Sequence, residues 1–470
     1  MARKQRIEDQ TAKTVHSTGL TRRDFLRGAL AAGVVSATAS SALAQSGSKS
    51  RSRSITPILA RQQSRVIEMW MWETEDQWLT VQERAALNEQ FPDVEFKWTT
   101  LGYSELHQKA VTSLAAGIPA GLPAIMRTHN PYYRALVSTG SLLDVTDQLV
   151  PYEDQVIQSV WQEGLIDGRH YHVPDDTVVE LLGYRTDIFE AAGLPTDPAE
   201  VSELLATMED FLAVAATIKE KTGANAISMT PDGTMFTALM GQNTTGPFDA
   251  EGNIIFDSPV HIEAAEMAKR LWESGLTLEL ETSGPQLYEA MNEGMLAMQF
   301  YRNYYDFVIL DNAPETAGKW RVAKLPKLNA ESKRATTAPG VGLAIPTIID
   351  PELQALAVEV AIYMKLSERA TTAHMRTFPG AFVSYIPGLE AMGNEPSPVL
   401  DGQSTYQVFL NAVQEEQPHA RLVTSAFESD TSAAINDAMF MILTQDAPVE
   451  ETLTNAANSI RQLQESRGIK

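Results

Sequence analysis

Strands and helices alternate along the first part of this chain that has a folded composition. Residues 66–70 (Val-Ile-Glu-Met-Trp) form a short apolar run typical of a buried strand, and 82–90 has helical periodicity. Residues 94–98 alternate as a second strand, 103–116 has one apolar helical face, and Ala124-Ile125-Met126 suits a third strand. This order predicts an α/β fold in which a parallel sheet carries helices on its faces.

The rest of the chain is rich in helical patterns. No period of about 20–50 residues repeats, so the chain is no solenoid. Its 470 residues are long for a single core, so two domains are expected. Helices are predicted at 184–192, 202–221, 259–274, 285–293, 351–366, 433–443 and 449–464, and strands at 294–298 and 341–345.

The N-terminal region has the pattern of an export signal. Thr21–Arg27 reads Thr-Arg-Arg-Asp-Phe-Leu-Arg, a modestly apolar run follows from 28 to 39, and Ala42-Leu43-Ala44 suits a cleavage site. This order is typical of twin-arginine export, and the run is too short and too rich in small residues to span a bilayer. We therefore expect residues 1–44 to be a signal peptide, residues 45–65 to be a disordered lead-in, and the protein to work in the periplasm.

Composition excludes several classes of function. The chain has no cysteine, so disulfides, thiolate catalysis, cysteine-bound metals and a lipid-anchoring cysteine are all ruled out. Its formal net charge of −23 repels nucleic acid and anionic lipid. No later run approaches about 18 apolar residues, the length of a membrane span. We expect a monomer with no nucleic-acid partner and no membrane anchor.

Catalytic motifs are missing from the sequence. It contains no Gly-x-Ser-x-Gly, no His-Glu-x-x-His and no glycine-rich phosphate loop with lysine. His170 and His172 could share a metal, but no acid or histidine cluster completes that site. We therefore predict that the protein is not an enzyme, with no catalytic residue, no metal and no cofactor.

A set of short segments, in a fixed order between residues 66 and 465, carries a family resemblance. Each segment alone is weak, and their common order is the stronger signal. The segments are Phe91–Val94, Tyr103–Lys109, Thr112–Gly117, Gly168–Pro174, Tyr184–Phe189, Ala192–Leu194, Phe256–Pro259, Met291–Met298, Gly340–Pro346 and Glu450–Leu453. Together they resemble the extracellular solute-binding proteins of ABC importers, in the branch that includes maltose-binding protein.

The resemblance implies a periplasmic binding protein-like fold of type II. Two α/β lobes would be joined by a hinge and would close over a ligand held between them. A sugar or sugar-like solute would be captured there and delivered to an ABC permease in the inner membrane. The lobes would be built from discontinuous segments, namely 66–175 and 340–400 for the N-terminal lobe and 176–339 and 401–470 for the C-terminal lobe.

The first candidate ligand-binding residues follow the predicted strands, because ligands of open α/β sheets lie beyond the carboxyl ends of strands. Trp72, Glu73 and Glu75 come after the first strand. An indole covers the apolar face of a sugar ring, and carboxylates accept hydrogen bonds from its hydroxyls. Asn130 and Tyr132 lie on the loop expected after the third strand, where a tyrosine offers an apolar ring with a polar tip.

The other candidates lie at the expected crossovers and beyond the 294–298 strand. Asp176 matches an acid common in the resembling family, and Tyr304 stands where its members stack an aromatic ring, usually tryptophan, on the ligand. Arg302 lies beside Tyr304. Gly340 and Gly342 would allow either close approach of the backbone to a ligand or hinge flexibility. Weaker candidates are Phe236, Met240, Phe378 and Arg421.

Two other functions stay open on the sequence. The same architecture could bind a cationic solute such as a polyamine or quaternary amine, with Glu73, Glu75, Asp175 and Asp176 beside aromatic rings. A periplasmic enzyme such as a glycosidase would instead use paired carboxylates. The sequence departs from the resembling family at Tyr304, at Gly168–Tyr171 and at Asn130–Tyr133, all near the expected ligand side, so the identity of the solute does not follow from the resemblance.

Overall fold

The computed structural model describes residues 65–72, 75, 81–117, 119, 121–249, 251–338, 340–421 and 427–467, and only the backbone at 81–83, 130 and 131. The expected signal peptide and, apart from Arg65, the lead-in lie outside these residues. Residues 62–470 form one compact unit. Among the described residues, no helix combines the length and the apolar character needed to cross a membrane.

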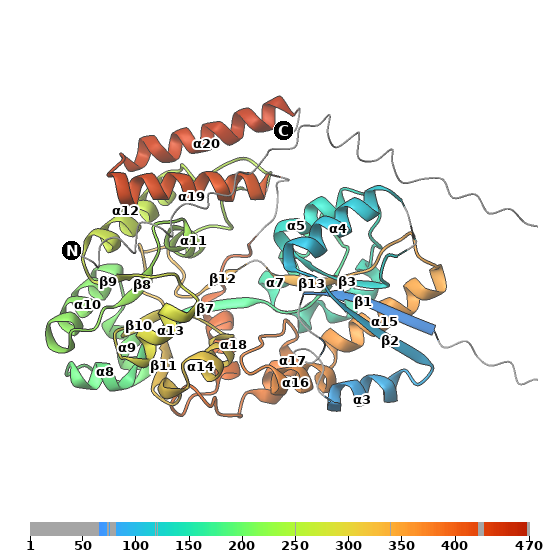
Figure 1. The fold of residues 1–470 in the computed structure, drawn as a ribbon, viewed down its shortest axis with the longest axis horizontal. Helices are drawn as coiled ribbons and strands as arrows, with labels where there is room; N and C mark the ends of the chain where they lie inside the picture. Colours follow the sequence, from blue (N-terminus) through green and yellow to red (C-terminus); the bar gives the residue numbers. More distant parts are fainter. Residues whose placement is uncertain are drawn as a thin grey trace, which may run out of the picture. The chain divides into compact units, whose positions relative to one another are not determined.

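The first sheet has five strands in the order β2-β1-β3-β13-β6 (Figure 1). Strand β1 is parallel to both β2 and β3, because helices α3 and α4 return the chain between them. Strand β13 comes from much later in the chain and pairs antiparallel with β3 and β6. The predicted βαβαβ order is therefore confirmed. The bounds are β1 Arg65–Met71, α3 Val81–Gln90, β2 Val94–Thr100, α4 Tyr103–Ala115, β3 Ile125–His129, β6 Val173–Pro174 and β13 Val341–Ala344.

The second sheet is built around β7 (Val178–Arg185), a nearly continuous apolar strand that is buried along most of its length. It pairs antiparallel with β10 (Met298–Arg302), β11 (Trp320–Ala323) and β12 (Thr336–Ala338). In this register Glu180 lies opposite both Arg302 and Thr336. Two short strand pairs complete the described sheets, namely β4 Leu165–Ile166 with β5 Arg169–His170 and β8 Ile227–Met229 with β9 Thr277–Glu279.

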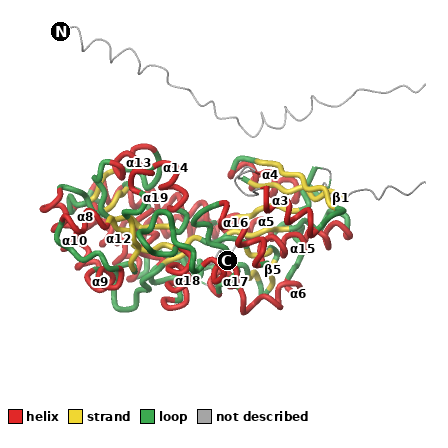
Figure 2. The backbone as a smooth tube through the Cα atoms, turned by 90° about the horizontal axis from the view of Figure 1, so that it is seen from below, coloured by secondary structure: helices red, strands yellow, loops and turns green. Residues whose placement is uncertain are grey.

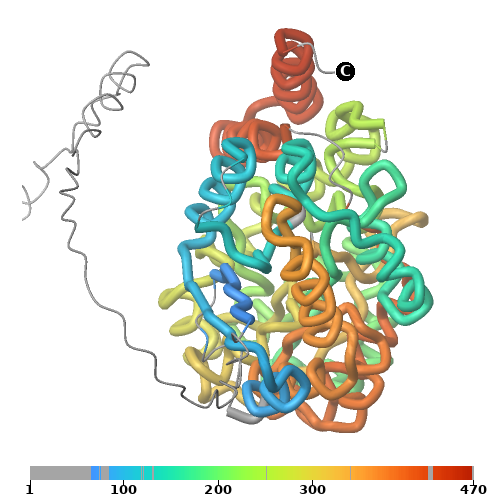
Figure 3. The backbone as a smooth tube through the Cα atoms, turned by 90° about the vertical axis from the view of Figure 1, so that its right-hand side faces the viewer, coloured from blue at the N-terminus to red at the C-terminus, as the bar shows by residue number. Residues whose placement is uncertain are grey.

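Helices pack against both sheets (Figure 2), while β2 at the edge of the first sheet is largely unburied. The two last helices, α19 and α20, pack side by side (Figure 3). The remaining bounds are α5 Asn130–Val137, α6 Thr146–Leu149, η1 Val150–Gln155, α7 Gln158–Glu163, α8 Thr186–Ala191, α9 Pro198–Leu204, α10 Met208–Thr222, α11 Thr234–Gly241, α12 Pro259–Glu273, α13 Pro285–Asn292, α14 Tyr305–Asn312, η2 Pro314–Thr316, α15 Pro351–Leu366, α16 Glu368–Thr377, α17 Ile386–Met392, α18 Thr405–Glu416, α19 Glu428–Gln445 and α20 Val449–Ser466.

Strand β7 contributes to two different apolar clusters. Val179 and Leu181 belong to a large cluster that also contains Ile67 of β1 and Leu343 of β13. Leu182 belongs to a second cluster, with residues of α10, α12 and α19. Packing is therefore continuous from the first sheet to the second, and this continuity positions the cavities described below.

Several predicted boundaries are wrong, and the helix expected at 433–443 is one of them, since α19 begins at Glu428. The strand expected at 294–298 begins at Met298, because the amides of Gly294 and Met295 bond back to α13 and close it with a turn. The helix expected from Tyr184 begins at Thr186, since Tyr184 still pairs within β7. The helix expected at 202–221 is two helices, because Thr207 and Asp210 form a capping box that starts α10.

Candidate functional site

A cavity of about 280 Å³ lies where residues of both sheets meet. We call it the Trp72 cavity. It brings together three residues predicted from the sequence, Trp72 after β1, Asp176 before β7 and Tyr304 after β10. Its other lining residues are Arg127, His129, Thr177, Val178, Asn303, Val341, His374, Phe378, Ala381 and Phe382.

Side chains of the first sheet hold the Trp72 indole in place. The Arg127 guanidinium lies over the ring, 4.6 Å from its centroid, a cation–π distance. The rings of Tyr103 and His107 lie 5.4 and 5.5 Å away, and Tyr132 stacks on His107 at 4.2 Å. Tyr132 therefore supports the wall of the cavity from behind, although it does not itself line the cavity.

Asp176 belongs to a buried cluster of charges. Arg127 donates to Asp175 at 3.0 Å and to Asp176 at 3.1 Å, and Lys365 pairs with Asp175. His374 lies 3.5 Å from Asp176. Burial works against ionisation of Asp176, but Lys365, His374 and Arg127 together hold its pKa well below the usual range. Burial and the neighbouring Asp176 raise the pKa of Asp175 to about 6.

One oxygen of Asp176 has no hydrogen-bond partner among the described residues. Asp176 Oδ1 is buried and accepts no hydrogen bond from any residue that the structure describes. The other oxygen, Oδ2, is bonded to Arg127. A buried acceptor of this kind is costly unless it is bonded, so it is suited to a hydroxyl of a bound molecule.

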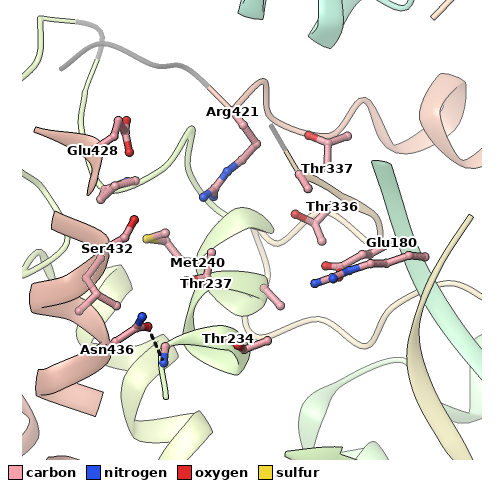
Figure 4. Close-up of a pocket in the computed structure, with 16 residues that line it drawn as sticks. Glu180, Thr234, Thr237, Met240, Thr336, Thr337, Arg421, Glu428, Ser432 and Asn436 are labelled. Atoms are coloured by element: carbon pink, nitrogen blue, oxygen red, sulfur yellow. Dashed lines mark hydrogen bonds and ion pairs between the residues drawn. The ribbon is translucent and has the colours of Figure 1, made fainter. Parts of the chain in front are cut away.

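A second cavity, of about 320 Å³, lies over β7 and is called here the Arg421 cavity (Figure 4). Strands β10, β7 and β12 supply Arg302, Glu180 and Thr336 on one side. Helices α11 and α19 supply most of the other side, tied together by the amide of Gly233, which donates to Asn436 Oδ1 at 3.1 Å. The other lining residues are Thr234, Thr237, Ala238, Met240, Pro247, Thr337, Ala338, Arg421, Glu428, Ser432 and Ile435.

Arg302 connects the two cavities. It lines the Arg421 cavity, and its Nη1 donates to the hydroxyl of Tyr304, which lines the Trp72 cavity, at 3.1 Å. Its Nε donates to Glu180 at 2.6 Å, and the charge of Glu180 raises the pKa of Arg302 above its usual range. Arg302 is therefore permanently charged, paired and fixed in direction.

The two candidate glycines are packed against protein groups. The amide of Gly340 donates to Glu163 at 2.8 Å, and Glu163 also accepts from the amide of Arg421 at 2.9 Å. A Cβ atom on Gly342 would lie 2.4 Å from the ring of His172. Among the described residues, neither glycine lines the Trp72 or the Arg421 cavity, so their ligand role stays a prediction.

The remaining predicted residues lie apart from the two cavities or outside the described part. Glu75 forms an ion pair with Arg84 at 3.0 Å. Glu73 lies outside the described residues, as does the side chain of Asn130. The loop predicted after the third strand is wrong, because β3 extends to His129 and α5 begins at Asn130 with a proline in its first turn.

Some of the residues that line the two cavities were not predicted from the sequence. Glu180 could have been recognised from the sequence. Apart from Arg185 at the end of β7, it is the one charged residue of an otherwise apolar strand, and a buried charge requires a partner or a function. His374 on α16 and Glu428 at the start of α19 carry no local signal. Only the packing of distant segments places them at the cavities.

Comparison with known proteins agrees with this geometry. Residues 73–355 match the family model of bacterial extracellular solute-binding proteins. An arabinooligosaccharide-binding protein of Halalkalibacterium halodurans is 25% identical over 291 residues, which are 60% of this chain and 63% of that protein. A lactose-binding protein of Rhizobium radiobacter is 24% identical over 409 residues, 82% of this chain and 90% of that protein.

Solved structures share the fold. The sugar-binding protein MalE of Xanthomonas citri has a TM-score of 0.71 at 16% identity and covers 86% of this chain and 98% of its own. The GacH receptor of Streptomyces glaucescens has a TM-score of 0.67 at 19% identity, over 86% and 99% of the two chains. The predicted periplasmic binding protein-like fold is thus confirmed. Because the family model matches more than half of its length, the chain belongs to the bacterial extracellular solute-binding proteins.

Proposed function

We propose that this protein is the substrate-binding component of an ABC importer and that it captures a sugar in the space formed by its two cavities. The observation that carries the proposal is the meeting of Trp72, Asp176 and Tyr304, from three distant segments, around one cavity. The arabinooligosaccharide- and lactose-binding relatives support a sugar as the solute.

The chemistry of the Trp72 cavity suits a sugar ring. The rings of Trp72 and Tyr304 offer apolar surface for the C–H face of the sugar, and Asp176 Oδ1 offers a free acceptor for a hydroxyl. Lining residues come from both sheets, so a bound sugar contacts both lobes of the proposed hinged fold. Such contacts favour the closed state by population shift, and the permease would recognise that state.

The two alternatives have weaker support. A cationic solute needs an uncompensated acid, but Asp175 and Asp176 already pair with Arg127, Lys365 and His374. A glycosidase needs a carboxylic acid that reaches the substrate. Asp175 has the raised pKa of such an acid, but it is 1% exposed and lines neither cavity. Glu428 also has a raised pKa, about 7, and lines the Arg421 cavity, but the second carboxylate there, Glu180, is already bonded to Arg302 at 2.6 Å. The proposal therefore includes no catalytic step.

The same proposal includes four further points. The protein is exported by the twin-arginine pathway, works in the periplasm and is a monomer. Its two lobes are divided at 175/176, 339/340 and 400/401. The pattern at Thr21–Arg27 supports the export route, and the separate sheets around β1 and β7 support the division. Mass spectrometry of the exported protein would give its cleavage site.

Calorimetric titration with lactose, arabinooligosaccharides and maltose tests the sugar proposal. We expect at least one to bind, and Trp72→Ala to weaken that binding about 10- to 100-fold, because the ring buries apolar surface worth about 1.5–3 kcal/mol. Trp272→Ala is the matched control, since Trp272 on α12 lines neither cavity and should leave affinity unchanged. No heat with any sugar, or equal affinity for both variants, would contradict the proposal.

A further inference from the structure

The side chain of Arg421 is buried at its cavity, and its guanidinium can donate more hydrogen bonds than it makes with the described residues. The residue is 8% exposed, and its Nη1 makes no hydrogen bond with any residue that the structure describes. Figure 4 shows the guanidinium directed toward Met240 of α11, on the side away from Thr336 and Thr337. Its amide is fixed by Glu163 at 2.9 Å, so the backbone below the side chain is held in place.

Burying the Arg421 guanidinium costs free energy when some of its N–H groups have no hydrogen-bond acceptor. Arginine stays protonated in proteins, and burial lowers the pKa of Arg421 without making it a neutral residue. A buried charge that donates fewer hydrogen bonds than it can is stabilised by any anion that completes the set. The unbonded Nη1 therefore indicates an anionic group on the molecule that fills the cavity.

The two acids of the cavity do not meet this need. Glu180 is already bonded to Arg302 at 2.6 Å, so that pair is neutral together. Glu428 forms no direct ion pair with Arg421 in the described part of the chain, although the charges of Glu428, Glu163 and Glu180 act on the guanidinium through space. Burial raises the pKa of Glu428 to about 7, so near neutral pH it carries only part of a negative charge.

The other side chains that line the Arg421 cavity include many hydroxyl groups and an amide group. Such groups suit the hydroxyls of a sugar ring, and a cavity of about 320 Å³ falls in the range of small-molecule sites, about 300–1,000 Å³. The planar guanidinium matches a carboxylate in two parallel hydrogen bonds. The polar lining residues are Thr234, Thr237, Thr336, Thr337, Ser432 and Asn436.

We infer that the Arg421 cavity takes an acidic sugar unit, a uronic acid, whose carboxylate is bound by the guanidinium of Arg421. This inference rests on the proposed function and goes further by naming the charge of the solute. The neighbouring Trp72 cavity would hold a further, neutral part of the same molecule, because Arg302 and Tyr304 join the two spaces.

Calorimetric titration of the full exported chain separates the possibilities. The acidic probes are galacturonate, glucuronate and digalacturonate, and the neutral partners of the same size are galactose, glucose and lactose. Glucose 6-phosphate is the anionic probe without a carboxylate. We expect an acidic sugar to bind at least tenfold more tightly than its neutral partner, and raised salt to weaken only the acidic sugar.

Variants then locate the carboxylate. Arg421→Gln should weaken binding of the acidic sugar about 10- to 100-fold, the range for a lost charged hydrogen bond, and should abolish its advantage over the neutral sugar. Arg270→Gln removes a surface charge bonded to Glu209 and should change neither affinity. Circular dichroism checks folding, and if Arg421→Gln does not fold, the comparison of probes on the unaltered protein still decides.

Each outcome has one meaning. Tighter binding of neutral sugars, preference for glucose 6-phosphate, or an Arg421→Gln variant with full affinity for the acidic sugar would overturn this inference and leave the proposed function standing. Failure of every sugar, acidic and neutral, would overturn the proposed function itself.

Discussion

At the scale of the residue, Gly342 is required by a packing contact in the core. A Cβ atom there would lie 2.4 Å from the ring of His172. That ring is buried and stacks on Tyr133 at 3.9 Å, so moving it would disturb this stacking. Glycine at position 342 therefore allows β13 and β6 to pair closely. This packing role does not depend on whether Gly342 contacts a ligand.

Gly342→Ala should lower the free energy of unfolding by about 2–3 kcal/mol, the usual range for overpacking a filled core. Urea unfolding measures the change. Gly102→Ala is the control, because a Cβ atom there would lie 3.7 Å from its nearest neighbours and should cost no more than about 1 kcal/mol. Equal stability of Gly342→Ala and the natural protein would show that His172 can move.

Single residues also show how far the sequence can predict the site. Trp72 and Tyr304 follow strands, and aromatic rings at strand ends are recognisable in the sequence. The partners that give Asp176 its charge state are not recognisable, because Lys365 and His374 reach it from α15 and α16, far along the chain. Sequence reasoning thus found side chains that face a ligand and missed those that only the packing brings near.

At the scale of the element, β4 and β5 form a hairpin around a two-residue turn. Asp167 and Gly168 both have positive φ, 51° and 73°, the geometry of a type I′ turn, for which Asp-Gly is a favoured pair. The turn directs His170 into the core, where its ring packs against Trp161 with centroids 4.2 Å apart. Both ring nitrogens of His170 are buried and have no bonding partner among the described residues.

This hairpin makes stability depend on pH. Burial lowers the pKa of His170 to about 4, below the value of about 6.5 in an unfolded chain. The unfolded state therefore binds the proton more readily, so the contribution of His170 is present above pH 6.5 and is lost as pH falls from 6.5 to 4. The loss is about 3 kcal/mol. Asp175, whose pKa is raised to about 6, acts in the opposite direction.

His170→Phe should remove the part of this dependence that comes from His170, while His172 and His261, whose pKa values burial lowers to about 3 and about 4, still contribute in the same direction. The ring contact with Trp161 is kept and no described hydrogen bond is lost, so stability at pH 7.5 should change by less than about 1.5 kcal/mol. Between pH 6.5 and 4 the variant should lose stability less steeply than the natural protein, by up to about 1.4 kcal/mol per pH unit. Urea unfolding at a series of pH values measures both curves, and parallel curves would contradict the assignment.

Elements also mark the limit of what the sequence predicts about the fold. The parallel part of the first sheet follows from alternating strands and amphipathic helices, and it is confirmed. Strand β7, the centre of the second sheet, was missed because its apolar run has no alternation, and a short apolar run alone does not distinguish strand from helix. The pairing of β13 with β3 depends on a chain return that no local pattern encodes.

At the scale of the whole molecule, a buried charge cluster ties the first crossover to the helices behind it. Asp175 is 1% exposed and pairs with Arg127 on β3 and with Lys365 on α15. Its backbone carbonyl also accepts from the amide of Ser384 at 2.8 Å. The crossover that leads into β7 is therefore fixed to three separate segments of the chain.

A double-mutant cycle on Asp175 and Lys365 tests whether this cluster acts as a unit. Asp175→Asn should lower the free energy of unfolding by about 3–5 kcal/mol, because Lys365 and Arg127 then remain buried with less negative charge beside them. In the double variant Asp175→Asn with Lys365→Met, the loss should be smaller than the sum of the two single losses by about 1–3 kcal/mol, since removing the lysine relieves the unpaired charge. The exposed pair of Glu209 and Arg270 is the control and should show little coupling. Additive losses at Asp175 and Lys365 would mean that the two side chains stabilise the crossover independently, and the joint between the two sheets would then depend on apolar packing alone.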